Sequence, residues 1–346
     1  MHGVSTDRLQ VSAALLTGLA EVTNASGLSY ESIAGAVGLA DFDPRDDEQF
    51  VNLDNFAKFL EVAAFLSADD CFGIRLGEWH FTAPAGPLAV ALANAADGRT
   101  ALEILSRHLS TRIDVAYAEL VVESNRVVVE WGFSPLLVKR WQLADFAAAS
   151  IIRLLRPIFE RNWRPLAVQL VRPAPRSLDC HRRVLGRAIE FSQRTNLIAF
   201  PLDALSAAPE NADPALFRLA CRLLDRIQVE RDRARDLITS VREEIIQALP
   251  SEDGAQLKRV ARRLGISERS LQRYLSAHNT SFQQLFDETR KGLAARYLED
   301  PGLSFSEIAY QLGFSAPSAF TRASYRWFGK KPSVVRGELR KEPTGR

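Results

Sequence analysis

Two segments repeat one pattern: LKRVARRLGISERSLQRYL at residues 257–275 and IAYQLGFSAPSAFTR at residues 308–322. In each, apolar residues recur at spacings of three and four, stop before a glycine and resume further along. Such spacing places apolar side chains on one face of a helix, and glycine tolerates the left-handed backbone of a sharp turn. Each segment is therefore predicted to form two helices joined by a tight turn, at Gly265 or Gly313.

The second helix of each pair has polar residues opposite its apolar face. Ser267 and Ser315 are placed to cap these helices, and Pro317 falls in a first turn, where its missing N–H costs little. Arginine and glutamine make paired hydrogen bonds to purine edges in a major groove, and lysine suits phosphates. The pattern thus predicts two helix-turn-helix units that bind double-stranded DNA. The expected contacts are Glu268, Arg269, Gln272, Arg273, Pro317, Ser318, Thr321, Arg322, Tyr325, Arg326, Lys330 and Lys331.

Residues 251–340 resemble the DNA-binding domain of the AraC/XylS family of bacterial transcription regulators. The matching run is Ile308-Ala-x3-Gly313-Phe314-x3-Ser318-x-Phe320-x-Arg322, and it continues from Arg326 to Ser333. The resemblance implies seven helices, with a long helix joining the two units, and RNA polymerase as a partner.

Ser324 departs from that family, which usually has an aromatic residue at this position. We expect the serine to weaken the packing of the second unit, or to reflect a local rearrangement. Its replacement by phenylalanine is then expected to strengthen folding or DNA binding.

Residues 1–208 have the mixed pattern of an α+β domain, with helices around an antiparallel sheet. The β-rich runs 118–124 and 126–133 predict a hairpin, and 141–159 predicts a long apolar helix. Further helices are expected within 9–39, broken around 24–27, at 54–66, 86–96 and 99–111, and near 181–185. Further strands are expected at 166–171, 188–191 and 197–200.

This region also resembles a known domain. Phe72-Gly-Ile-Arg75-Leu-Gly77, Trp163-Arg-Pro165 and Arg194-x-Asn196-x-Ile198-x-Phe200-Pro201 are similar to the effector-sensing domain of ornithine- and arabinose-type regulators in the same family. The resemblance implies that residues 1–208 sense a small molecule, without naming it.

Charge is divided unevenly along the chain. Residues 251–346 carry 17 Lys and Arg against 10 Asp and Glu, a net of +7, whereas residues 1–250 carry 27 against 32, a net of −5. A cationic module joined to a mildly acidic one fits nucleic-acid binding at one end only. The sequence thus predicts an effector-binding domain at 1–208, a helical linker at 209–250 and an all-α DNA-binding domain with two helix-turn-helix units at 251–346. The linker helix either packs on its own domain or forms a homodimer.

Several classes of site lack their sequence signatures. Cys71, Cys180 and Cys221 are far apart and show neither metal spacing nor a disulfide framework, which favours a reducing cytosol. No histidine pairs with another at ligand spacing, and no nucleophile elbow or phosphate-binding loop occurs. We therefore expect no catalytic residue, metal or cofactor. No apolar run is long enough to span a membrane, and the start lacks signal-peptide features, so a cytoplasmic protein is expected.

The effector is less well defined by the sequence. Arg172 and Arg176 have a spacing that can clamp phosphate and stack on guanine, although the same spacing recurs elsewhere in this Arg-rich chain. They are candidate effector contacts, and they leave open a regulator that responds to a cyclic dinucleotide. An enzyme-like sensor domain fused to a DNA-binding tail also stays open. The favoured interpretation is a transcription activator controlled by a small molecule.

Overall fold

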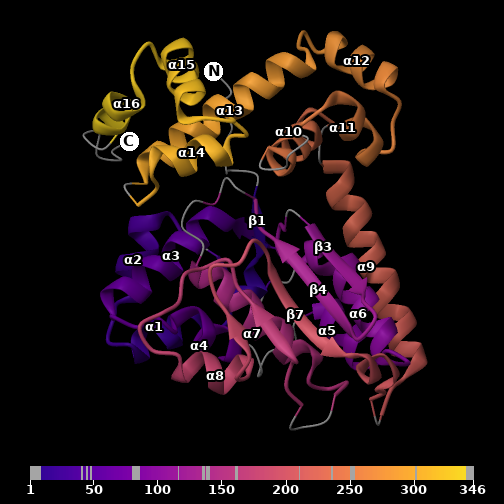
Figure 1. Ribbon diagram of the computed structural model, residues 1–346. Coiled ribbons are helices and arrows are strands. Elements are labelled where there is room, and N and C mark those ends of the chain that lie inside the picture. The colour runs from indigo at the N-terminus through magenta and orange to yellow at the C-terminus, as the bar shows by residue number, and fades with distance from the viewer. Residues whose placement is uncertain are drawn as a thin grey trace. The chain divides into compact units, whose positions relative to one another are not determined.

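A computed structural model shows the arrangement of the chain (Figure 1). It describes residues 9–39, 42, 43, 46, 49–79, 86–115, 117–134, 137, 141–159, 163–209, 211–234, 237–249, 254–300 and 302–339. The chain divides into two compact units. The N-terminal unit comprises Asp7–Phe133 and Lys139–Asp232, and the C-terminal unit is built on Arg233–Arg346. The division falls inside the segment 209–250 that the sequence indicates as a linker.

A five-stranded sheet forms the centre of the N-terminal unit, in the order β3-β4-β7-β5-β6. The predicted hairpin is confirmed, with Val122 paired to Val127 next to the turn. β5 and β6 are parallel, because the helix α8 lies between them in the chain and supplies the crossover that parallel strands need. The strands are β3 (Tyr117–Val122), β4 (Arg126–Gly132), β5 (Ala167–Gln169), β6 (Ile189–Glu190) and β7 (Asn196–Pro201).

A second, two-stranded sheet pairs β1 (Gln10–Ser12) with β2 (Phe50–Asn52). The prediction of helix through the start of 9–39 is therefore wrong at β1, because three residues are too few to show the alternation typical of a strand. The predicted helix break is confirmed, since α1 (Leu19–Ala25) ends before α2 (Tyr30–Val37) begins.

Helices pack around the larger sheet (Figure 1). Two glycines of the Phe72–Gly77 motif explain the close packing of α4 against α7. A Cβ atom at Gly73 would lie 2.1 Å from the Gln142 carbonyl oxygen, and one at Gly77 would lie 2.6 Å from the Ala149 Cβ. The helices are α3 (Leu53–Leu66), α4 (Phe72–Trp79), α5 (Gly86–Ala93), α6 (Gly98–His108), α7 (Trp141–Leu155) and α8 (Asp179–Leu185), with 3-10 turns η1 (Ala13–Leu16), η2 (Leu109–Thr111) and η3 (Leu202–Ser206).

The long helix α9 (Pro214–Ala234) packs on the N-terminal unit. Ala220 and Leu224 are buried, and polar contacts hold the same helix to the region around η2. These contacts join Asp225 to His108, Gln228 to Ser110 and Arg231 to Asp114. Local packing is thus the observed alternative for this helix, and Leu216, Leu219 and Leu223 remain exposed on it.

The C-terminal unit has seven helices among its described residues, as the resemblance implies. The central helix α13 follows α12 in the chain and contacts α14 and α15, so it links the first helix pair to the second. It also contacts α10 and α16. Serine caps begin three of the helices, and Ser304 with Glu307 forms a complete capping box. The helices are α10 (Leu237–Ala248), α11 (Leu257–Arg263), α12 (Glu268–Ala277), α13 (Phe282–Glu299), α14 (Phe305–Gln311), α15 (Pro317–Phe328) and α16 (Pro332–Leu339).

Candidate nucleic-acid interface and ligand pocket

The first helix pair, α11 and α12, has the geometry that its sequence predicts. Gly265 makes the turn at φ +68°, and the Ser267 hydroxyl caps α12 by accepting from the Ser270 N–H at 3.1 Å. Leu271 and Leu275 are buried behind α12. The four predicted contact residues of this helix, Glu268, Arg269, Gln272 and Arg273, are all exposed.

One residue on this face was missed by the sequence analysis. Ser276 follows Gln272 by one helical turn and is exposed, so it extends the same polar surface. The spacing of four from Gln272 was the signal that could have identified it.

The second pair, α14 and α15, turns at Gly313, with φ +69°. Phe314 plugs the turn as expected, with its ring centroid 6.0 Å from the rings of both Phe320 and Trp327. The predicted cap at Ser315 is wrong: the N-cap is Ala316, without a side-chain cap, and Pro317 starts the helix. Proline at the first helical position lacks an N–H and has a φ angle that suits a helix, and it starts this helix without a capping side chain.

The outer face of α15 presents several of the predicted contacts. Pro317, Ser318, Arg322 and Tyr325 are exposed. Thr321 is half-buried, and its hydroxyl donates to the Pro317 carbonyl oxygen at 3.1 Å. Its hydroxyl hydrogen is therefore engaged, whereas the hydroxyl oxygen can still accept a hydrogen bond.

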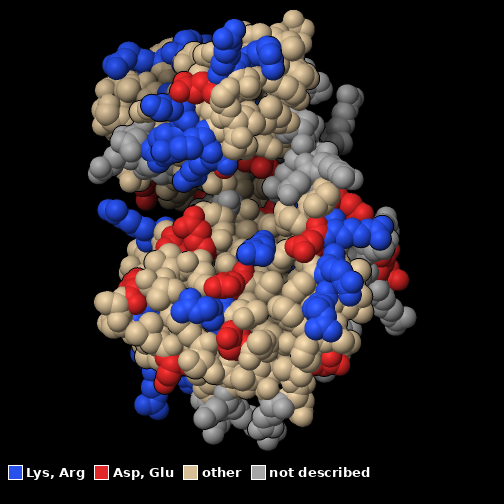
Figure 2. All heavy atoms as spheres, turned by 90° about the vertical axis from the view of Figure 1, so that its right-hand side faces the viewer, with Lys and Arg blue, Asp and Glu red and all other residues tan. Residues whose placement is uncertain are grey.

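Cationic side chains near the end of α15 differ in whether they form ion pairs within the C-terminal unit. Arg326 forms an ion pair with Asp287 of α13, and Lys330 forms one with Glu338 of α16. Lys331 is exposed. Exposed ion pairs contribute little to stability, so Arg326 and Lys330 can exchange these carboxylates for phosphates. Figure 2 shows Lys and Arg gathered on the face of the C-terminal unit that it presents.

Ser324 has a structural role that the sequence analysis did not anticipate. Its side chain is fully buried, and its hydroxyl donates to the Lys330 carbonyl oxygen at 2.8 Å. This bond spans the end of α15, where Gly329 adopts a left-handed conformation. The serine therefore bonds the turn that follows the helix, and its effect on the stability of the second unit stays a prediction.

Arg290 attaches the second helix pair to α13. Its guanidinium carbon lies 3.6 Å from the centroid of the Phe314 ring, and its Nε donates to the Leu312 carbonyl oxygen at 2.9 Å. Burial lowers the pKa of Arg290 to about 10, and the guanidinium stays charged at neutral pH. Asp287, one turn earlier, accepts from Trp327 Nε1 at 3.0 Å. These contacts fix the orientation of α14 and α15 on the central helix.

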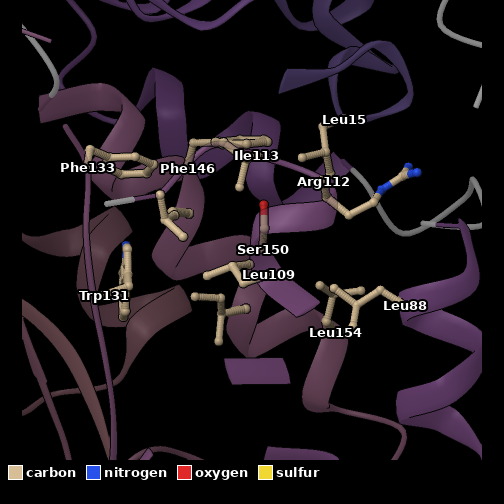
Figure 3. Close-up of a pocket in the computed structure, with 13 residues that line it drawn as sticks. Leu15, Leu88, Leu109, Arg112, Ile113, Trp131, Phe133, Phe146, Ser150 and Leu154 are labelled. Carbon is tan, nitrogen blue, oxygen red and sulfur yellow. The ribbon is translucent and has the colours of Figure 1, made fainter. Parts of the chain in front are cut away.

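The N-terminal unit contains a narrow, mainly apolar pocket between η1, α5, β4 and α7 (Figure 3). Its volume is about 30 Å³, enough for one or two water molecules, so a larger ligand must displace lining side chains. Three of those side chains carry polar atoms: Arg112, Trp131 and Ser150. The apolar lining comes from Leu15, Leu88, Leu109, Ile113, Val115, Phe133, Phe146, Ala147, Ile151 and Leu154.

Two of the polar atoms are buried without a hydrogen-bond partner among the described residues, namely Ser150 Oγ and Trp131 Nε1. Figure 3 shows the Ser150 hydroxyl amid the apolar side chains. Buried polar groups are nearly always satisfied in folded proteins, so these two atoms are open to a hydrogen bond with a water molecule or a ligand. The sequence analysis missed both residues, although Ser150 interrupts an otherwise apolar stretch of α7.

Arg172 and Arg176 do not form the clamp that their spacing suggests. Arg172 is buried and pairs with Asp145, which also lies 3.0 Å from His181 Nε2. Arg176 is exposed, and its backbone N–H donates to Asp70. Arg172 is thus a structural cation, and this removes it from the candidate effector contacts.

The described ranges contain neither a candidate metal cluster nor a candidate membrane-spanning helix. No cluster of three or more His, Cys, Asp and Glu side chains there has the arrangement of a metal site. No described helix combines the length and apolar character needed to cross a membrane.

Known proteins resemble both units. Residues 27–208 match the family described as the arabinose-binding N-terminal domain of AraC transcription regulators, and residues 260–338 match a helix-turn-helix domain family. The chain is 31% identical over 307 residues to the HTH-type transcriptional regulator VirS of Mycobacterium tuberculosis, covering 84% of this chain and 85% of VirS. It is 29% identical over 284 residues to the ornithine utilization regulator of Pseudomonas aeruginosa, covering 82% and 83% of the two chains.

Among solved structures, the transcriptional regulator CdpR from Pseudomonas aeruginosa matches 89% of this chain and 97% of its own length. The identity is 19% and the TM-score is 0.41.

Proposed function

The chain belongs to the AraC family of transcription regulators, and from that premise we propose that α12 and α15 read DNA sequence while a ligand in the N-terminal pocket controls this activity. It is a DNA-binding regulator with a ligand-binding domain, and not an enzyme. The observation that carries the proposal is that both helices have a buried apolar back and an exposed polar front.

The exposed side chains differ in what they can recognise. Arg269, Gln272 and Arg322 have the donor and acceptor groups that pair with purine edges in the major groove. Lys331, with Arg326 and Lys330 after exchange of their ion pairs, suits backbone phosphates. The remaining proposed contacts are Glu268, Arg273, Pro317, Ser318, Thr321 and Tyr325, with Ser276 added.

Selection of bound duplexes from a random pool by the full chain tests the proposal. We expect one enriched sequence with two blocks, and a dissociation constant that rises steeply with salt in fluorescence anisotropy. Enrichment of no sequence, with equal affinity for all duplexes, would contradict sequence reading by these helices.

The chemistry of the pocket indicates the class of effector. Trp131 Nε1 can only donate a hydrogen bond, Arg112 is cationic, and no Asp or Glu is among the lining residues. An ammonium group finds no carboxylate there, and a sugar would press most of its hydroxyls against apolar side chains. We therefore propose a slender apolar carboxylate as the ligand, with its oxygens bonded to Ser150 and Trp131.

Calorimetric titration with aromatic and aliphatic carboxylates, ornithine and arabinose separates these classes. We expect binding of the apolar carboxylates and not of ornithine or arabinose. Ser150→Ala or Trp131→Phe should weaken this binding about tenfold through loss of one hydrogen bond to a charged ligand. Ser106→Ala is the matched control, because that hydroxyl is bonded within α6, to the Glu103 carbonyl oxygen. Unchanged affinity in both pocket variants would show that the ligand binds at another site.

Three further features are proposed from family membership: activation of transcription, contact with RNA polymerase and a cytoplasmic location. Transcription in vitro with purified polymerase, with and without the chain, distinguishes activation from repression.

We also propose a homodimer through the exposed leucines of α9, Leu216, Leu219 and Leu223. The three leucines follow one another at spacings of three and four, so they form one apolar face of α9. Sedimentation of the full chain should show a dimer that Leu219→Lys converts to monomer. A wild-type monomer at micromolar concentration would exclude this interface.

A further inference from the structure

Two cysteines that are far apart in the sequence lie side by side in the N-terminal unit. Cys71 immediately precedes α4, and Cys180 lies in the first turn of α8. The two thiols interact with each other, and Cys71 Sγ lies 3.6 Å from Nδ1 of His181, the residue that follows Cys180. The absence of a disulfide spacing in the sequence concealed this contact, because it depends on the packing of α4 against α8.

The surroundings of Cys180 favour its thiolate. The hydrogen bond from Cys71 and the positive charge of Arg183 lower the pKa of the Cys180 thiol to about 7, against the opposing effect of partial burial. A guanidinium nitrogen of Arg183 lies 3.9 Å from the sulfur. Cys180 is half-buried, so a small reagent can reach a sulfur that is substantially ionised at neutral pH.

Cys71 is more deeply buried and has a base beside it. Its Sγ lies 3.6 Å from His181 Nδ1, and His181 Nε2 lies 3.0 Å from Asp145 Oδ2. A proton on Nε2 that is donated to Asp145 leaves Nδ1 as an acceptor. His181 can therefore receive the thiol proton when Cys71 reacts.

We propose that Cys71 and Cys180 are a redox-sensitive dithiol, which hydroperoxides oxidise to an intramolecular disulfide. The Cys180 thiolate attacks the peroxide, an S–O bond forms as the O–O bond breaks, and the departing alkoxide or hydroxide takes up a proton. The sulfur of Cys71 then attacks the Cys180 sulfenic acid, and its proton passes to His181. The S–S bond forms as the S–O bond breaks, and hydroxide leaves and is protonated to water. Two thiols and one hydroperoxide thus give one disulfide, one alcohol or water from the peroxide, and one further water.

The disulfide would connect the start of α4 to α8. Both helices pack on α7, and other residues of α7, including Phe146 and Ser150, line the ligand pocket. Oxidation therefore constrains the helices that support the proposed effector site, although the dithiol itself does not depend on that site.

The third cysteine provides an internal control. Burial, together with the charge of Asp225, raises the pKa of the Cys221 thiol. Limited alkylation of the full chain at pH 7, followed by peptide mass spectrometry, should modify Cys180 about tenfold faster than Cys221, because thiolate is the nucleophile.

Oxidation is tested on the Cys221→Ser full chain with hydrogen peroxide. We expect both remaining thiols to disappear together, a peptide linking Cys71 to Cys180, and reversal by dithiothreitol. The thermal midpoint of the N-terminal unit should rise by about 5 °C on oxidation, because the disulfide closes a long loop.

Variants of each cysteine define the order of attack. With Cys71→Ser, the Cys180 sulfenic acid should persist and be trapped by dimedone. Cys180→Ser, at a half-buried position, should slow oxidation of Cys71 at least tenfold. Two results would overturn the proposal without the use of cysteine variants at positions 71 and 180. One is equally slow alkylation of Cys180 and Cys221 in the wild-type chain, and the other is the absence of a linked peptide after peroxide treatment.

Discussion

Gly265 and Gly313 have nearly the same backbone conformation but different surroundings. Their φ angles are +68° and +69°. A Cβ at Gly265 would meet no atom within 4 Å, whereas a Cβ at Gly313 would lie 2.5 Å from the Leu249 carbonyl oxygen. Glycine is therefore needed at position 265 only for the backbone conformation of the turn. At position 313 it is needed for the turn and also because the end of α10 leaves no space for a Cβ atom.

Gly265→Ala and Gly313→Ala should consequently differ in stability. We expect Gly265→Ala to cost about 1 kcal/mol, from the left-handed conformation. Gly313→Ala should cost about 2–4 kcal/mol, because a backbone clash is added to the strain. Urea unfolding of the full chain, followed by tryptophan fluorescence, measures both. Equal losses would show that the Leu249 contact is relieved by a small shift.

Ser324 is buried at the end of α15, where the family resemblance leads us to expect an aromatic side chain. The position is usually aromatic in related proteins, but here the side chain is fully buried and bonded to the Lys330 carbonyl oxygen. A phenylalanine ring in place of the serine has no space there unless neighbouring side chains move.

Ser324→Phe should therefore destabilise the C-terminal unit, in contrast to the expectation from sequence. We expect a loss of about 2–4 kcal/mol, from overpacking together with the lost hydrogen bond. Ser324→Ala serves as the control and should lose only about 1 kcal/mol. A phenylalanine variant that is as stable as wild type would mean that the side chains around position 324 can move to make room for the ring.

The helices of the C-terminal unit depend on a few long-range contacts with α13. Arg290 is the principal one, because it stacks on Phe314 and bonds the Leu312 carbonyl oxygen at the end of α14. A lysine has no planar group to stack and has three N–H donors, whereas arginine has five.

Arg290→Lys should loosen the second helix pair while the first remains folded. The expected loss is about 1–3 kcal/mol, from a cation–π contact and one charged hydrogen bond. Amide hydrogen exchange should increase in α14 and α15 and stay unchanged in α11 and α12. Arg187→Lys, at an exposed arginine of the N-terminal unit, is the control. Uniform faster exchange across both pairs would contradict the local role.

Substitutions in α12 and after α15 should cause two different kinds of DNA-binding defect. Arg269→Ala, on α12, should cost about 1–3 kcal/mol on the preferred site and relax specificity at one base pair. Lys331→Ala should weaken binding to all sequences and reduce the salt slope by about one unit. Anisotropy titrations on matched and mutated sites at several salt concentrations measure both. The same uniform loss in both variants would assign Arg269 to the phosphates.

At the scale of the whole molecule, sensing and DNA binding reside in separate compact units. A carboxylate in the pocket should therefore stabilise the N-terminal unit selectively. Calorimetry should show two transitions, of which one gains about 2.7 kcal/mol at a ligand concentration one hundred times the dissociation constant. Ser150→Ala should reduce that gain at a fixed concentration. A gain confined to the other transition would place the ligand in the C-terminal unit.

The local patterns of the sequence determined the C-terminal unit. The helix pairs, the glycine turns and the Ser267 cap follow from spacings of a few residues, because helix periodicity and left-handed turns depend on near neighbours. The hairpin β3–β4 was predictable for the same reason. The short strands β1 and β2 were not, since only their mutual pairing makes them strands.

The tertiary structure alone decided which polar groups meet. The sequence placed Arg172 and Arg176 together as a possible clamp, but folding pairs Arg172 with Asp145 instead. Packing also brings Ser150 and Trp131 into one pocket, and brings Cys71 against Cys180. These partners come from distant parts of the chain. The number of residues between two segments does not give their distance in space, because such segments meet only when the core is packed.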